Sequence, residues 1–329
     1  MPFISSIRRN YEQEKQENNS QDFEITGGDL VYTAGGYRIH TFTSTGEAEL
    51  FVKNIGNTNT MNLSSGVDVE YLVVAGGGAG SGGLGGGGGA GGLLTGWTNL
   101  PIGSNNVNVG AGVTGSIGGS SRPAANINTG NPSNNSILGS IEAVRGGAAG
   151  RHREGQQPGL PGGSGGGGGT NPYGSGGAGI QGQGYPGGDG GPGPTNYNAG
   201  GGGGAGERGS HSHSLRPDTS SGKGGNGLIS SIEGIAYAYA GGGGGCSHSR
   251  PGPAASGGLG GGGGGSGDAG AAGLGGLGRN AGTPGTVAPG NNDGGPGGAN
   301  TGGGGGGGSW NPTRGGTGGP GIVVIRYRI

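Results

Sequence analysis

The sequence predicts a mostly β protein, with little α-helix, in which a small β-sandwich carries a large inserted bundle of polyglycine-II helices. Two observations predict this class. All but seven of the 103 glycines lie between Gly76 and Gly321, which is about two residues in five there against an ordinary content of roughly 7%. The two most strand-like segments of the chain bracket this block, VDVEYLVVA at 67–75 and IVVIRYRI at 322–329.

A block this rich in glycine cannot build a core from side chains, so order in it must come from main-chain hydrogen bonds. Collagen needs glycine at every third position, and the unbroken runs at 85–89 and 302–308 do not keep that register. A flexible linker is the simpler alternative, because glycine loses the most backbone entropy on ordering. Polyglycine-II helices have three residues per turn and outward-facing N–H and C=O groups, so neighbouring helices satisfy one another and leave no room for side chains.

The spacing of the glycine runs favours the bundle over the linker. Runs of five or more glycines start at positions 85, 165, 200, 241, 260 and 302, so that most intervals lie near 20, 40 or 80 residues. Such intervals are expected when the chain passes repeatedly through a bundle. Five to seven residues of this helix span roughly 15–20 Å, which sets the expected bundle height. The glycines predicted to be structural are Gly87, Gly167, Gly202, Gly243, Gly263 and Gly305.

The chain is predicted to have three regions. Residues 1–22 are polar, with a few apolar residues at roughly helical spacing, and are either a frayed terminus or an arm that docks onto a partner. Residues 23–75 form the sandwich, which the strand at 322–329 completes, and residues 76–321 form the bundle with displayed loops. Because an insertion is tolerated when its ends are close, the strands at 67–75 and 322–329 are expected side by side in one sheet.

Several segments inside the glycine block are also strand-like. The segments 107–109, 137–144 and 234–240 are short strand candidates. The main apolar cluster of the block is predicted to fill the seam between sheet and bundle, with Trp97 in the core. Its members are Leu93, Leu94, Trp97, Leu100 and Ile102.

Composition excludes several classes of function. The net charge of −1 and the 11% charged content give no basic field for nucleic acid. Cys246 is the single cysteine, so no disulfide forms within the chain. The first residues hold no apolar signal region, and no stretch approaches the ~20 apolar residues of a membrane span. We therefore expect a protein made without a cleaved export signal and without membrane insertion.

Three chemical signals are weighed and set aside. G-x-G-x-x-G patterns recur at this glycine content, but no helix follows the strand before them, so no nucleotide cofactor is expected. The His211/His213 and Cys246/His248 pairs match no standard zinc spacing, and no metal is expected. No nucleophile motif or carboxylate pair occurs, so the chain is not predicted to be an enzyme.

The chain contains, in this order, the segments VEYLVVAGGGAGSGG, NVGAGV, NSILGSIEAVRGG, AYAYAGGGGG, NTGGGGGGGS and GGPGIVVIRY. This ordered series resembles the glycine-rich structural proteins of tailed phages, especially marine phages that infect cyanobacteria. GGYRIHTFTSTGEAELFV is similar to the strand pair before the block in that family. The resemblance covers residues 24–329. Polyglycine-II bundles occur in phage tail-tip adhesins, and also on a tumour-necrosis-factor-like sandwich in the ectodomain of certain animal receptor kinases, whose signal peptide, membrane segment and disulfides this chain lacks.

The resemblance implies a virion structural protein, a tail-fibre component or tip adhesin, assembled in the host cytoplasm. The implied sandwich is tumour-necrosis-factor-like and the implied assembly is a homotrimer. Residues 1–22 are expected to attach to other tail or fibre proteins. The alternative is a passive spacer or decoration protein that binds no receptor.

Specificity is expected from the segments between glycine runs, because a glycine bundle displays only backbone. Three polar inserts, 151–158, 207–220 and 246–254, are predicted to gather at the end of the bundle far from the sheet, whereas 223–240 is predicted to return at the sheet end. Arginine and aromatic rings suit a host-surface glycan or outer-membrane receptor. The predicted receptor-binding residues are Arg151, His152, Arg153, Arg208, His211, His213, Arg216, His248, Arg250 and Trp310.

Overall fold

In the computed structural model, every named secondary-structure element among the described residues is a β-strand. The described residues are 23–55, 66–117, 134–152, 158–170, 174–191, 197–212, 221–248, 253–268, 270–287, 291–310 and 313–329. No α-helix is assigned in these ranges, which agrees with the predicted fold class. Within them, no helix is long and apolar enough to cross a membrane. The predicted arm at 1–22 lies outside the described residues.

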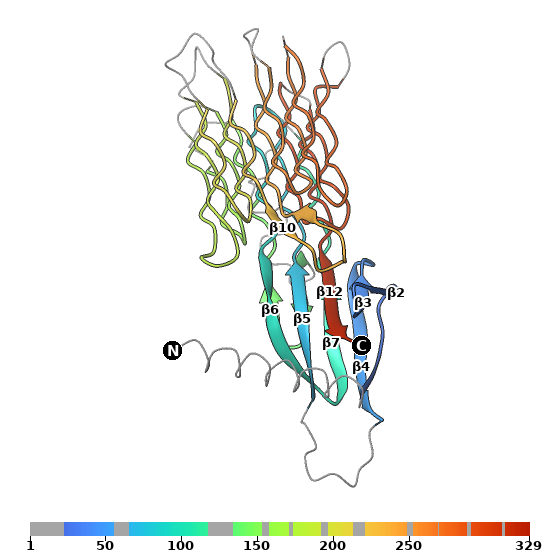
Figure 1. Cartoon of the computed structure of the whole chain (residues 1–329). Helices are drawn as coiled ribbons and strands as arrows, with labels where there is room; N and C mark the ends of the chain where they lie inside the picture. Colours follow the sequence, from blue (N-terminus) through green and yellow to red (C-terminus); the bar gives the residue numbers. More distant parts are fainter. Residues whose placement is uncertain are drawn as a thin grey trace, which may run out of the picture.

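Two five-stranded antiparallel sheets, here called the sandwich, form the base of the molecule (Figure 1). The first has the order β1-β4-β7-β8-β9, with bounds Phe23–Thr26, Gly46–Asn54, Gly103–Val109, Ser136–Leu138 and Ile141–Ala143. The second has the order β2-β3-β12-β5-β6, with bounds Leu30–Ala34, Tyr37–Phe42, Ile322–Arg328, Gly66–Val74 and Leu93–Pro101. Alternate residues of both sheets share one core, among them Leu50, Val107, Val69 and Ile325.

The two strands that bracket the glycine-rich block are neighbours, as predicted. β12 pairs antiparallel with β5, from Ile322 opposite Val74 to Arg326 opposite Glu70. β12 also pairs with β3 on its other side, so it is a central strand. Its continuous apolar run, Ile322 to Ile325, is fully buried because the core lies on one face and the bundle junction on the other.

The sandwich is larger than the sequence predicts. Four of its ten strands, β6 to β9, come from within 76–321, so the predicted limits of 23–75 and 322–329 are too narrow. The candidate at 107–109 is the end of β7, and the candidate at 137–144 is the β8–β9 hairpin. The bundle proper therefore begins with 75–92 and resumes after β7 and again after β9.

The prediction that Trp97 lies in the core is wrong. Its side chain is 50% exposed, and that of Ile102 is 46% exposed. Strand alternation explains the error, since β6 turns Leu94 and Leu100 toward the core and Trp97 outward. Of the predicted seam residues, Leu93 is buried in the cluster where bundle and sheet meet.

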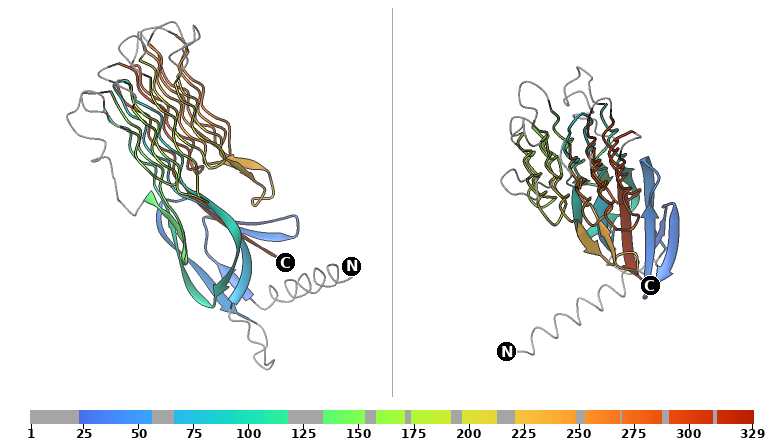
Figure 2. Two further views of the ribbon diagram at one scale, coloured as in Figure 1. Left: turned by 90° about the vertical axis from the view of Figure 1, so that its left-hand side faces the viewer. Right: turned by 90° about the horizontal axis from the view of Figure 1, so that it is seen from above.

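Beyond the sandwich the chain runs up and down in parallel extended passes (Figures 1 and 2). Pass 85–92 shows how the passes are joined, because its successive N–H groups donate hydrogen bonds to three neighbouring passes in turn. Every third N–H donates to the same neighbouring pass: 85, 88 and 91 bond to the carbonyls of Gly308, Gly305 and Gly302. Residues 86, 89 and 92 bond to Gly150, Gly147 and Val144, and residues 87 and 90 bond to Gly200 and Gly203. A three-residue period is what polyglycine-II helices require, so it supports that prediction.

The six glycines predicted to be structural lie where no side chain fits. At each of them an added Cβ would lie within 3 Å of a backbone oxygen on another pass. Gly87 faces the carbonyl of Gly243, and Gly243 in turn faces that of Gly305. The glycine runs therefore follow from close packing of backbone against backbone.

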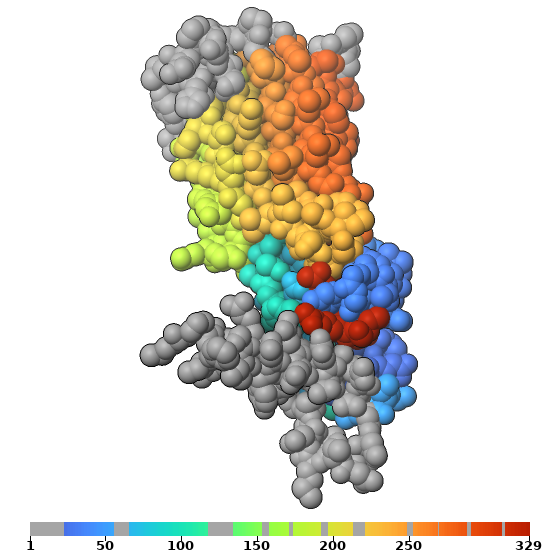
Figure 3. All heavy atoms as spheres, in the orientation of Figure 1, coloured from blue at the N-terminus to red at the C-terminus, as the bar shows by residue number. Residues whose placement is uncertain are grey.

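A hairpin of β10 (Leu228–Ser230) and β11 (Tyr237–Tyr239) returns at the sheet end, as predicted for 223–240. The loop between these strands buries Ile232 against the outer face of the second sheet, beside Ile39 and Val324. The space-filling view shows the yellow-to-orange bundle standing directly on the sandwich (Figure 3).

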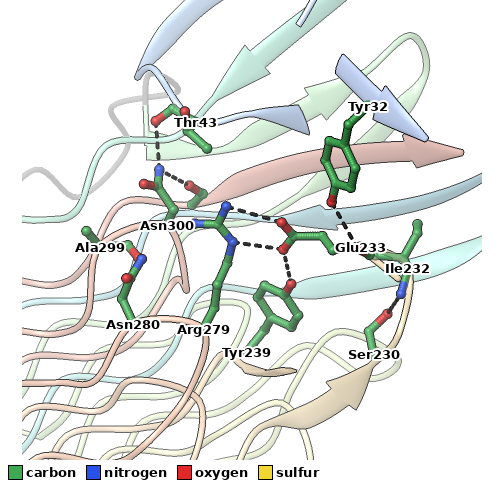
Figure 4. Close-up of polar contacts among 11 residues, drawn as sticks. Tyr32, Thr43, Ser230, Ile232, Glu233, Tyr239, Arg279, Asn280, Ala299 and Asn300 are labelled. Carbon is green, nitrogen blue, oxygen red and sulfur yellow. Dashed lines mark hydrogen bonds and ion pairs between the residues drawn. The ribbon is translucent and has the colours of Figure 1, made fainter. Parts of the chain in front are cut away.

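A buried ion pair fastens this junction (Figure 4). Glu233, in the hairpin loop, is 6% exposed. Arg279, from the turn after a descending pass, donates to both of its carboxylate oxygens, at 2.8 and 3.1 Å. The hydroxyl of Tyr239 donates to the same carboxylate, and the hydroxyl of Tyr32 from β2 donates to the Glu233 carbonyl at 3.0 Å. Hairpin, bundle and sheet thus meet at one residue.

His40 of β3 is a buried histidine held in its neutral form. Its Nδ1 lies 2.7 Å from the carbonyl oxygen of Gly27, to which it donates, and its Nε2 lies 3.4 Å from the hydroxyl of Tyr327. The side chain is 1% exposed. Burial lowers the pKa of His40, the Gly27 hydrogen bond opposes this, and the charge of Arg38 adds to it.

Stability is therefore expected to fall in mild acid. Above the ordinary histidine pKa of ~6.5 both folded and unfolded chains hold His40 neutral. As the pH falls below that value, the unfolded chain binds a proton first, so the free energy of unfolding decreases until the folded pKa is passed. Melting temperatures between pH 8 and pH 5 test this. His40→Asn, which does not titrate, should flatten the slope, and an unchanged slope in that variant would contradict the assignment.

Candidate site at the end of the bundle

Four aromatic side chains form a continuous row at the end of the bundle opposite the sandwich. We call His152, Tyr197, His248 and Trp310 the tip row. The rings of His152 and Tyr197 meet edge to face with centroids 5.5 Å apart, and those of Tyr197 and His248 are 5.9 Å apart. His248 and Trp310 stack at 4.7 Å with planes only 10° apart. The four residues come from four different passes, so the fold and not local sequence brings them together.

The row rests on a small apolar cluster. Leu84, Ala199 and Cys246 are buried together, and Tyr197 packs against them. Leu84 lies in the turn between the first two passes and adopts a φ of 61°, which is uncommon for leucine. Its N–H and C=O bond to Ser309 and Thr170, which tie together three passes under the row. His152 is fixed in turn, since its Nδ1 lies 3.1 Å from the hydroxyl of Thr170.

Among the described residues, one close charged pair lies at the row. Nδ1 of His248 contacts the carboxylate of Asp268, and the two side chains are 15% and 27% exposed. Burial lowers the pKa of His248, although the carboxylate of Asp268 opposes that shift. Trp310 at the end of the row is 51% exposed. The row therefore offers an accessible indole backed by an imidazole, with a carboxylate beside it.

Two of the predicted arginines are not displayed at the tip. Arg151 lies at the predicted end, but it is only 5% exposed because its backbone packs against Gly169 of a neighbouring pass. Arg208 lies at the opposite end. It follows Ala205, which is buried in the cluster against the sheet, and Gly204 N–H bonds to the carbonyl of Glu207 to form the turn there. The prediction that 207–220 as a whole forms a distal insert is wrong, since it contains this turn and an ascending pass.

Of the remaining predicted residues, His211 is described and forms an ion pair away from the tip row. His211 lies on the ascending pass and contacts Asp189 at 2.9 Å, with both side chains about two-fifths exposed. No described contact joins this pair to the tip row. Outside the described residues lie Arg153, His213, Arg216 and Arg250.

Sequence reasoning found three members of the row and missed Tyr197 and Asp268. Tyr197 is one of several tyrosines between glycine runs, and nothing in its local sequence distinguishes it. Asp268 is a single acidic residue after a glycine run. The signal that identifies both is their level in the bundle, because residues at equal heights on adjacent passes become neighbours.

Within the described chain, no group of three or more His, Cys, Asp or Glu side chains is arranged to hold a metal ion. Cys246 is two residues from His248, but its thiol is fully buried, and burial raises its pKa. It therefore packs as an apolar group below the row. The chemistry that the row does offer is ring stacking, with hydrogen bonding at its carboxylate.

Comparison with known proteins places the chain in a family without indicating a ligand. The sequence model of a family described as glycine-rich domain matches residues 53–328. A search of curated proteins and a search of solved structures each gave no significant match. The matched range includes every bundle pass and every member of the tip row.

Proposed function

This chain belongs to the glycine-rich domain family, and we propose that it is a phage virion protein, a tail-fibre component or tip adhesin that recognises the host surface with the end of its bundle. The observation that carries the proposal is the tip row. Trp310 is half exposed and stacks on His248 at the end farthest from the sandwich, and it is not a member of the apolar cluster below the row. Exposed, well-supported aromatic residues are typical of recognition sites.

The bundle is suited to hold the four rings of the tip row rigidly. We infer that its passes are polyglycine-II helices, because hydrogen bonds recur at every third residue. Backbone bonding to several neighbours at once fixes each pass, so the four ring-bearing ends keep their relative positions. A site preorganised in this way loses little entropy when it binds.

The resemblance supplies the remaining parts of the proposal. It implies a place in the virion tail or fibre, attachment to other tail proteins through residues 1–22, and a host glycan or outer-membrane protein as receptor. It also implies a homotrimer, which rests on the resemblance alone. The tumour-necrosis-factor-like strand order likewise stays a prediction.

Replacing Trp310 by alanine should weaken adsorption at least about tenfold, because truncating an aromatic anchor in a binding site commonly costs 2 kcal/mol or more. Binding of the purified, fluorescently labelled chain to a panel of cyanobacterial strains measures this. Tyr185→Ala is the matched control, since Tyr185 is also 50% exposed but its N–H bonds to Gly204 near the sheet end.

Equal adsorption by the two variants would contradict recognition at the tip. Absence of adsorption to every strain would favour the passive spacer. Melting temperatures for both variants should match that of the unaltered chain, because each removed side chain is half exposed.

A further inference from the structure

Among the described residues, one long edge strand of the sandwich lacks the usual protection. β6 ends the second sheet, and its nine residues, LLTGWTNLP, carry no charge. The other edge strands of the described sandwich are shorter: β1 has four residues, β2 five and β9 three, and both β1 and β9 contain a glutamate. Native proteins normally shorten or charge such edges, because an open strand edge pairs readily with another chain.

The open hydrogen-bonding groups of β6 can be assigned. The N–H of Leu93 donates to the carbonyl oxygen of Gln183 at 3.1 Å and therefore points away from β5. Strand alternation turns the N–H and C=O groups of Thr95, Trp97 and Asn99 to the same side. Among the described residues none bonds to these groups. Their side chains also share one face, on which Trp97 is 50% exposed.

We propose that two copies of this chain pair antiparallel through β6, with the two-fold axis at Trp97. This register is self-complementary. On the outer face the two Trp97 rings meet, and Thr95 of each copy lies opposite Asn99 of the other. On the inner face Leu94 lies opposite Leu100, so the apolar core continues across the joint. A two-fold axis at Gly96 would instead place Thr95 against Trp97 and Leu94 against Thr98.

The absence of charge is what makes a second copy the fitting occupant. A two-fold axis brings each residue near its own counterpart, so a charged edge would repel itself, whereas β6 meets no like charge. The pair joins two five-stranded sheets into one of ten strands. Because the strands are antiparallel, the two bundles point in opposite directions and each end of the pair carries a tip row. The inference does not depend on the function of that row, and it stands in place of the homotrimer that the resemblance implies.

Cysteine cross-linking of the full chain tests the register. Cys246 is fully buried, so one introduced cysteine is the reactive thiol. In the proposed pair the Cα atoms of the two residues 97 lie about 5.5 Å apart, within disulfide range. Two residues 95, or two residues 99, lie about 14 Å apart. Trp97→Cys should therefore form a covalent dimer, Thr95→Cys and Asn99→Cys alone should not, and their equimolar mixture should.

Sedimentation gives an independent readout. The unaltered chain should show a concentration-dependent dimer, and Trp97→Lys should be monomeric. Its melting temperature should match that of the unaltered chain at concentrations where that chain is monomeric, because residue 97 is half exposed in a single copy. A monomer or a trimer for the unaltered chain would overturn the proposal. Equal cross-linking by Thr95→Cys and Trp97→Cys would overturn it as well.

Discussion

Valine at Gly87, Gly167 or Gly305 is expected to lower the free energy of unfolding by at least about 3 kcal/mol. At each position a Cβ would lie within 3 Å of a backbone oxygen, those of Gly243, Gly200 and Gly316 respectively. Backbone cannot rotate away as a side chain can, so the passes must separate. Each separation breaks further bonds, such as Gly87 N–H to Gly200 and Gly167 N–H to Gly87. Thermal and denaturant unfolding of the purified variants measures the loss.

Ala178→Val is the matched control for these variants. Ala178 lies on a pass whose burial repeats every three residues, and it occupies the exposed position. Its added methyl groups meet solvent, so stability should change by less than about 0.5 kcal/mol. If the glycine variants melted like this control, the runs would be solvent-exposed linkers and the bundle would be disproved.

Alanine at Arg279 is expected to cost about 3–5 kcal/mol, because it leaves the buried Glu233 carboxylate without its cation. The carboxylate would keep only the hydroxyl of Tyr239, whose pKa is already raised by burial and by Glu233. Since Glu233 joins hairpin, bundle and sheet, the loss should appear in the main unfolding transition. Differential scanning calorimetry measures it.

Two further variants make this result specific to burial. Lys53→Ala removes an ion pair with Glu24 whose side chains are 62% and 52% exposed, so it should cost less than about 1 kcal/mol. Adding Glu233→Gln to Arg279→Ala should restore part of the stability, because the uncompensated charge is gone. If Arg279→Ala and Lys53→Ala lowered the free energy of unfolding equally, the junction ion pair would contribute no more to stability than an exposed pair does.

The strand signals were the most reliable part of the sequence. Alternation in 47–53 puts Leu50 and Val52 on one face of the strand, opposite Glu47 and Glu49, and both are fully buried. The segment 67–75 is continuously apolar from Tyr71, which is typical of a strand buried on both faces, and β5 buries Val73 in the sandwich core and Leu72 and Val74 at the bundle junction. These patterns succeed because burial in a sheet follows the two-residue period of the strand itself.

The predicted limits of the sandwich were too narrow because 76–321 was treated as one glycine-rich block, although residues 93–143 hold only 9 glycines in 51 positions. β6 contains Gly96, and four of the seven residues of β7 are asparagine or serine. Trp97 was misplaced for a related reason. Alternation shows which residues share a face, but whether the bundle covers that face depends on how far it extends over the sheet.

The sequence predicts which types of residue form the candidate site, but it does not predict which of those residues meet in space. His152, His248 and Trp310 are separated by roughly a hundred and sixty residues, and their meeting depends on the lengths of the passes between them. A difference of a few residues decides whether an insert reaches the tip, as His248 does, or turns at the base, as Arg208 does. Of the predicted arginines that the structure describes, neither Arg151 nor Arg208 is displayed at the tip, whereas His152, His248 and Trp310 lie together there.

Electron cryo-microscopy of an intact phage particle that carries this chain tests the proposed function most directly. Density for the chain should lie at the outer end of a tail fibre, with a tip row of His152, Tyr197, His248 and Trp310 facing solvent. Density inside the capsid or tail tube, or a bundle end covered by another virion protein, would contradict recognition through the tip row.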